Sequence, residues 1–208
     1  DLALGYVVFV PDYRSSGDYG PRPAAQRLAR GEESSLADFV DAVTGVEHML
    51  RQRFIDPRRV ALIGHSAGGP RAYAAAIARP DLFAALIVNE GIAPDPLFET
   101  IATLSGSMTG SPYMGVLEDL YGASMAEAPE RYSVNMAFRA ARMTTPTLIM
   151  MGNETLGGAG RQPWEVVYSI LRSRGVATEL LVFTEEGHNY SRPESARLAF
   201  NRARTWLE

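Results

Sequence analysis

The stretch Gly64-His65-Ser66-Ala67-Gly68-Gly69 constrains the fold more than any other part of the sequence. Residues 59–63 before it are apolar and rich in β-branched side chains, which predicts a buried strand. Residues 70–79 after it are rich in alanine and stop at a proline, which predicts a helix. A Gly-x-Ser-x-Gly turn between a strand and a helix is a nucleophile elbow, in which a strained turn exposes the serine hydroxyl and small flanking residues let strand and helix approach. We therefore predict that Ser66 is a nucleophile and that the Ala67 backbone N–H faces the developing oxyanion.

Strand and helix patterns alternate along the rest of the chain. Besides the strand before the elbow, strands are expected at residues 5–10, 84–88, 147–151 and 178–183. Besides the helix after the elbow, helices are expected at residues 36–50, 164–174 and 197–207. This order predicts one α/β domain over residues 1–208, with a mostly parallel sheet covered by helices on both faces. Residues 94–142 lack clear periodicity and predict a small cap of helices over the site, or ordinary crossover helices.

The composition is that of a globular enzyme domain. The net charge of −4 gives no basic surface for nucleic acid or for an anionic membrane. No apolar run approaches the ~20 residues that a membrane-spanning helix needs. The absence of cysteine excludes disulfides, thiolate metal sites and a cysteine nucleophile. Both a cytoplasmic and a secreted bacterial location remain open, as does assembly into a homo-oligomer.

Three histidines compete for the role of general base. His48 lies off the apolar face of its predicted helix, so we expect it to be solvated. His65 sits inside the elbow, where its side chain is expected to point away from the serine hydroxyl and to pack near the pocket. His188 follows the last predicted strand in a loop, which is where a fold with this elbow carries its base. An imidazole there can accept the serine proton and return it to the leaving group, the alternative being a loop histidine without a role.

Two further patterns could suggest a cofactor or a metal site, but their residues lead us to predict neither. Residues 152–159 have the glycine spacing of a phosphate-binding loop, but Gly158 and Ala159 stand where lysine and Ser or Thr are required. A turn is the better interpretation. The adjacent acidic pairs Glu32-Glu33 and Glu185-Glu186 cannot form a cleft pair by themselves, and we interpret them as solvated loop charge.

Four segments resemble the α/β-hydrolases of the prolyl oligopeptidase-like type, peptidase family S9. They are the Tyr-Arg loop at residues 10–20, the Asp-Pro turn at residues 55–60, the elbow at 64–69 and Glu186-Gly187-His188. The resemblance implies an α/β-hydrolase fold, a three-layer sandwich, and a serine hydrolase that forms an acyl-enzyme on Ser66. It implies a peptidase or a carboxylesterase with a small ester or peptide substrate. It also places Tyr13, within the Tyr-Arg loop, beside the oxyanion or the substrate.

The same resemblance implies that further strands and a His-Gly-Gly-type loop precede Asp1 in the parent protein. One of these strands would lie between residues 5–10 and the nucleophile strand, and the loop would provide the second oxyanion donor. We therefore expect an N-terminally incomplete domain, which is poorly soluble or self-assembling when it is expressed as given. A non-catalytic binding module and an acyltransferase are the alternative functions.

The acid of the triad is where this chain departs from its relatives. The usual aspartate follows a glycine by three residues after the strand at 147–151, and here that position is Thr155. We favour Glu90, which follows the strand at 84–88 and stands 24 residues (90 − 66) after the nucleophile, as in some lipases and dehalogenases. A buried carboxylate at that position needs a partner, and the base would be one. Glu154 is the second candidate and Asp95 the third, and a salt bridge from Glu90 to Arg14 is the alternative.

Overall fold

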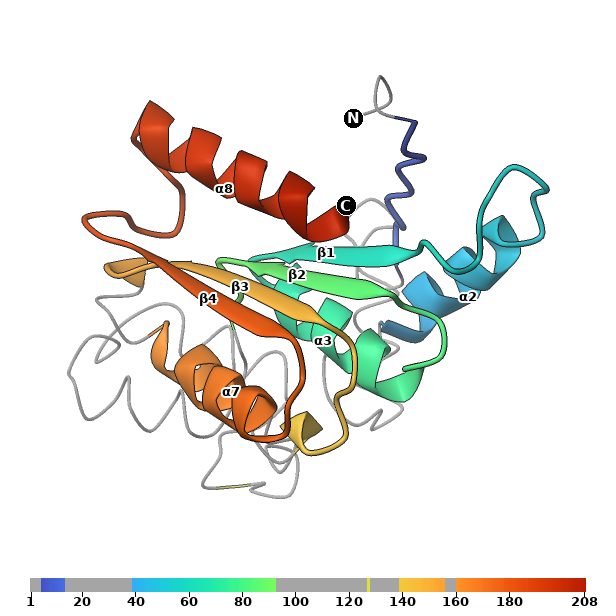
Figure 1. Cartoon of the computed structure of the whole chain (residues 1–208), viewed down its shortest axis with the longest axis horizontal. Coiled ribbons are helices and arrows are strands. Elements are labelled where there is room, and N and C mark those ends of the chain that lie inside the picture. Colours follow the sequence, from blue (N-terminus) through green and yellow to red (C-terminus); the bar gives the residue numbers. More distant parts are fainter. Residues whose placement is uncertain (1–4, 14–38, 93–126, 128–138, 156–159) are drawn as a thin grey trace.

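A computed structural model describes residues 5–13, 39–92, 127, 139–155 and 160–208 (Figure 1). Four parallel strands pair in the order β1-β2-β3-β4, and they are β1 (Ala61–His65), β2 (Ala85–Asn89), β3 (Thr147–Gly152) and β4 (Thr178–Phe183). His65 at the end of β1 is in register with Asn89 at the end of β2. The carboxyl ends of parallel strands form one edge, and at this edge the loops after β1, β2, β3 and β4 meet.

Helices cover both faces of the sheet, as predicted. Helices α3 (Gly68–Ala78) and α7 (Gln162–Ser173) lie on one face, and α8 (Pro193–Leu207) lies on the other (Figure 1). Between the sheet and helices α3 and α7, one cluster of buried side chains includes Tyr73, Val88 and Trp164. Between the sheet and α8, a second cluster includes Ile87 and Phe183. Every residue of β3 is buried, which explains the continuous apolar run of that strand.

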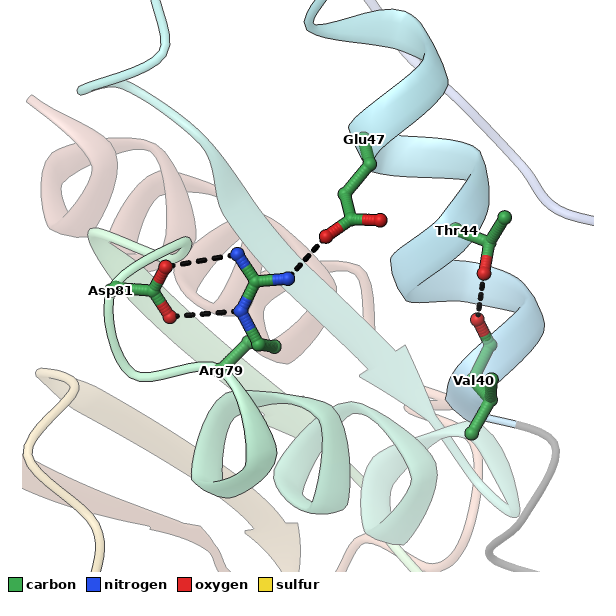
Figure 2. A network of polar contacts seen from close by, with 5 residues as sticks. All are labelled: Val40, Thr44, Glu47, Arg79 and Asp81. Atoms are coloured by element: carbon green, nitrogen blue, oxygen red, sulfur yellow. Dashed lines mark hydrogen bonds and ion pairs between the residues drawn. The ribbon is translucent and has the colours of Figure 1, made fainter.

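Helix α2 (Phe39–Met49) packs on the outer side of α3. Val43 of α2 joins Ala75, Leu82 and Phe83 in a third apolar cluster. Above this cluster, Arg79 at the end of α3 forms ion pairs with Glu47 of α2 and with Asp81 (Figure 2). Because ion pairs at such an exposed position contribute little, the apolar contacts of the third cluster are what hold α2 in place.

The predicted strand at residues 5–10 is wrong. These residues have no regular secondary structure, and Val8 and Val10 expose 63% and 82% of their surface. Phe9 lies against Gly45 of α2, where a Cβ atom would come within 2.5 Å of the ring. An apolar segment becomes a strand only when a neighbour pairs with its backbone. Among the described residues β1 pairs with β2 alone, so no strand lies between β1 and this segment.

The remaining expected elements are present, with bounds shifted by a few residues. The largest shift is in α8, which begins at Pro193, where the ring of proline is compatible with the first helical position. The predicted cap at residues 94–142 lies outside the described residues except for residue 127 and residues 139–142. Within the described part of the chain, no helix combines the length and apolar character needed to cross a membrane.

Candidate active site

Ser66 occupies a strained turn between β1 and α3. Its φ is +53°, a left-handed conformation that costs a residue with a side chain about 1–3 kcal/mol. The turn is held by its main chain: Ser66 N–H donates to the carbonyl of Asn89 (3.1 Å), and the Ser66 carbonyl accepts from Gly69 (3.0 Å) and Ile92 (3.0 Å). The strain and its backbone partners are those of a nucleophile elbow.

Two glycines of the elbow are required by close contacts. A Cβ on Gly64 would collide with the Gly68 carbonyl, and one on Gly69 would lie 2.8 Å from Cα of Gly91. Strand β1 therefore touches the start of α3 at Gly64, and the loop after β2 touches α3 at Gly69. A Cβ on Gly68 would meet nothing within 4 Å. The position two residues after the serine therefore has space for a side chain, and the expectation that both flanking positions are tight holds only for Gly64.

The imidazole of His188 lies against the Ser66 hydroxyl. Its Nε2 is 2.9 Å from Ser66 Oγ, which is hydrogen-bond distance for transfer of the hydroxyl proton. Burial, and the neighbouring His65, lower the pKa of His188 below its ordinary 6.5. The ring is therefore neutral at pH 7 and able to accept a proton. Its Nδ1 is buried and has no hydrogen-bond partner among the described residues.

The loop that carries His188 is fixed by the buried carboxylate of Glu186. This side chain accepts hydrogen bonds from the main chain of Ser191 (2.7 Å) and Arg192 (3.1 Å), and from the Ser191 hydroxyl (3.0 Å). Burial alone would raise its pKa, but these bonds and one from Ser195 lower the pKa of Glu186 to about 2. The expectation of solvated loop charge is wrong for Glu186, because the N-terminus of α8 offers free N–H donors.

We predict that Glu186→Gln lowers the melting temperature at pH 7, because an amide cannot accept all of these hydrogen bonds. The folded-state pKa is below the ordinary 4.5, so the carboxylate stabilises the fold above pH 4.5 and loses this effect as the pH falls toward 2. The difference between the two proteins should therefore shrink over that range. Glu194→Gln, which changes an exposed carboxylate in the first turn of α8, is the matched control and should lower the melting temperature much less. Equal melting temperatures for all three proteins at pH 7 would contradict the role of Glu186.

Glu90 is buried at the end of β2, with 1% of its surface exposed and a φ of +49°. Its two carboxylate oxygens accept from the Gly152 N–H (2.5 Å) and from the Thr155 hydroxyl (2.5 Å). Burial raises the pKa of Glu90, and the hydrogen bonds from Thr155, Gly152 and Tyr190 oppose that rise. The expected hydrogen bond from Glu90 to His188 Nδ1 is not made in this structure.

Glu154 makes no hydrogen bond to His188 Nδ1 among the described residues. It is exposed, and its main-chain N–H donates to the Glu186 carbonyl (2.9 Å), which fixes the loop after β3. Asp95 and Arg14 lie outside the described residues. The carboxylate of Glu90 thus contacts Thr155, the residue that stands where the resemblance places an aspartate.

The residues predicted for the oxyanion side of the site lie at and beside the N-terminus of α3. Ala67 is its N-cap residue, in a region where main-chain N–H groups have no partner inside the helix. Arg71, one turn later, donates to the Ala67 carbonyl (2.7 Å) and stacks its guanidinium over the Tyr13 ring at 5.1 Å from the ring centroid. Tyr13 therefore lies beside the first turn of α3.

A second histidine in the site was only partly anticipated. His48 is exposed, as expected, but the ring of His65 stacks on that of His188, with centroids 5.2 Å apart. His65 Nδ1 is 3.2 Å from Asn89 Nδ2, and the Tyr190 hydroxyl donates to Asn89 Oδ1 (2.6 Å). Asn89 and Tyr190 are separated by 101 residues and belong to no local motif. In the described part of the chain, acidic and histidine side chains form no group of three that could hold a metal ion.

Comparison with known proteins places the chain beside a group of peptidases. A model of the prolyl oligopeptidase family matches residues 2–208. The acylamino-acid-releasing enzyme of Rattus norvegicus is 29% identical over 216 residues, which cover 98% of this chain and 27% of that enzyme. Dipeptidyl-peptidase 5 of Porphyromonas gingivalis is 23% identical over 98% of this chain and 29% of its own length.

Solved structures agree with this placement. A puromycin hydrolase is similar with a TM-score of 0.73 and 25% identity, covering 94% of this chain and 28% of that protein. The acylaminoacyl peptidase of Pyrococcus horikoshii has a TM-score of 0.71 and 25% identity, covering 94% and 30%. The predicted α/β-hydrolase fold is confirmed. The chain spans less than a third of the length of each of these relatives.

Proposed function

Because the chain belongs to the prolyl oligopeptidase family, we propose that it is a serine peptidase in which Ser66 is the nucleophile and His188 the general base. The observation that carries this proposal is the 2.9 Å contact between His188 Nε2 and Ser66 Oγ. The two residues are 122 positions apart in the sequence, and separate elements bring them together at the carboxyl edge of the sheet.

Each step of the reaction uses a group at this edge. Ser66 Oγ attacks the scissile carbonyl and forms a C–O bond, while its proton passes to His188 Nε2. The Ala67 N–H stabilises the tetrahedral oxyanion, and Tyr13 is our candidate for a further contact on that side. His188 then donates the proton to the leaving amine, and the C–N bond breaks. A water, deprotonated by His188, hydrolyses the acyl-enzyme and regenerates the serine hydroxyl.

Glu90 is our candidate for the carboxylate that offsets the positive charge of the His188 imidazolium. It is the buried carboxylate at the end of the strand that neighbours the nucleophile strand. Its carboxylate contacts Thr155, the position at which the family resemblance places an aspartate. The negative charge of Glu90 therefore lies close to where the charge of such an aspartate would lie. Glu154 supports this role less well, because its side chain is exposed.

Relatives named for the release of acylamino acids and of dipeptides favour short peptides as the substrate class. We predict that the full-length natural protein releases p-nitroaniline from N-acetyl-alanyl or dipeptidyl p-nitroanilides. The test is a panel of both amide types together with p-nitrophenyl butyrate. Turnover of the ester alone would overturn the peptidase assignment. No turnover of any substrate, together with no reaction with a fluorophosphonate probe, would indicate a non-catalytic binding module instead.

A further inference from the structure

Among the described residues, the His188 imidazole has a hydrogen-bond partner at one of its two ring nitrogens and none at the other. His188 makes one hydrogen bond, from Nε2 to Ser66, while its buried Nδ1 has no partner among the described residues. A ring held at a single atom can pivot about that contact, and proton transfer requires a fixed orientation. Within the described part of the chain, the contact left to orient this ring is therefore one other than a hydrogen bond.

That contact is the ring of His65. The two imidazoles are stacked, with centroids 5.2 Å apart and planes inclined by 28°. His65 is the last residue of β1 and directly precedes the nucleophile, so its backbone is fixed by the sheet and by the elbow. A rigid neighbour on one face of the His188 ring limits how far that ring can tilt.

A chain of hydrogen bonds sets the orientation of the His65 ring. Burial, and then the charge of Glu90, raise the pKa of Tyr190, so its hydroxyl keeps its proton and donates to Asn89 Oδ1. This fixes the amide, and Asn89 Nδ2 lies 3.2 Å from His65 Nδ1.

We propose that His65 is a positioning residue for the general base, and that Tyr190 and Asn89 hold its ring stacked on His188. The proposal rests on the proposed function of His188. Charge and orientation are then supplied by different residues, with Glu90 providing the negative charge and His65 the orientation.

The test is the second-order rate at which a fluorophosphonate probe labels Ser66 in the full-length natural protein and its variants. His65→Ala should slow labelling by about 10- to 100-fold, because the His188 ring loses its support. His65→Phe keeps an aromatic ring at that position and should label within about threefold of the natural rate. His48→Ala, on the exposed side of α2, is the matched control and should label at the natural rate. Melting temperatures of all variants exclude a loss of folding.

A double-variant cycle separates the chain through His65 from the contact between Tyr190 and Glu90. Tyr190→Phe alone should slow labelling about tenfold, because Asn89 is no longer oriented. In the His65→Phe background the same change should cost less than about twofold, since a phenyl ring at that position has no nitrogen for Asn89 to orient. Tyr168→Phe on α7 controls for removal of a tyrosine hydroxyl and should have no effect.

Three outcomes would overturn the proposal while leaving the proposed function intact: natural-rate labelling of His65→Ala, equal slowing in His65→Ala and His65→Phe, or the same Tyr190→Phe penalty in both backgrounds. Failure of the natural protein to react with the probe at all would instead refute the proposed function, and the role of His65 with it.

Discussion

Ser66→Ala is expected to abolish both fluorophosphonate labelling and peptide hydrolysis, with a loss of about 10⁴-fold or more in turnover. The reason is geometric, since Ser66 Oγ lies 2.9 Å from His188 Nε2 in a turn whose φ of +53° projects the hydroxyl above the sheet. Alanine keeps the turn and removes only the attacking atom. His188→Ala should slow labelling severely, because the hydroxyl then has no proton acceptor.

The measurement is probe incorporation and p-nitroaniline release by the full-length natural protein. Ser173→Ala is the matched control, because this exposed hydroxyl on α7 donates to the Ile170 carbonyl, a local contact within its own helix. It should leave both rates unchanged. Rapid labelling of Ser66→Ala would mean that the nucleophile has been misplaced.

The parts of the site that could be predicted from the sequence are those that local geometry dictates. Gly64 and Gly69 are glycines because backbone atoms of α3 and of the loop after β2 occupy the space of a Cβ. The elbow is therefore visible in six consecutive residues. His188 was identified by its place after the last strand, and the structure brings it to Ser66.

The parts that could not be predicted depend on contacts between distant segments. An apolar run at residues 5–10 has the composition of a strand, but strand formation needs a pairing partner and no local pattern reveals one. Glu186 is buried rather than solvated because α8 begins next to it and offers main-chain donors. The contact of Asn89 with Tyr190 joins two loops that have no sequence relation.

The second large effect is expected from removing the carboxylate that offsets the positive charge of the His188 imidazolium. Glu90→Gln should lower the turnover number by about 100-fold, because the imidazolium formed during attack would lose its counter-charge. Glutamine can still accept from the Gly152 N–H, and the Thr155 hydroxyl can rotate to accept from the new amide, so the fold should be retained. Glu194→Gln is the exposed control and Glu154→Gln the competing candidate, and both should keep near-natural turnover.

A swap of positions tests the assignment more sharply than the single variant. Thr155 Oγ1 lies 2.5 Å from the Glu90 carboxylate, so Thr155→Asp places a new carboxylate on the same side of the base. In the Glu90→Gln background this change should restore most of the lost turnover. In the natural background it would put two carboxylates side by side, one of which must take up a proton, and activity should fall at neutral pH. If Glu90→Gln left turnover intact while Glu154→Gln reduced it by orders of magnitude, the acid would belong to the loop after β3. Glu90 would then be a structural carboxylate that ties β2 to that loop.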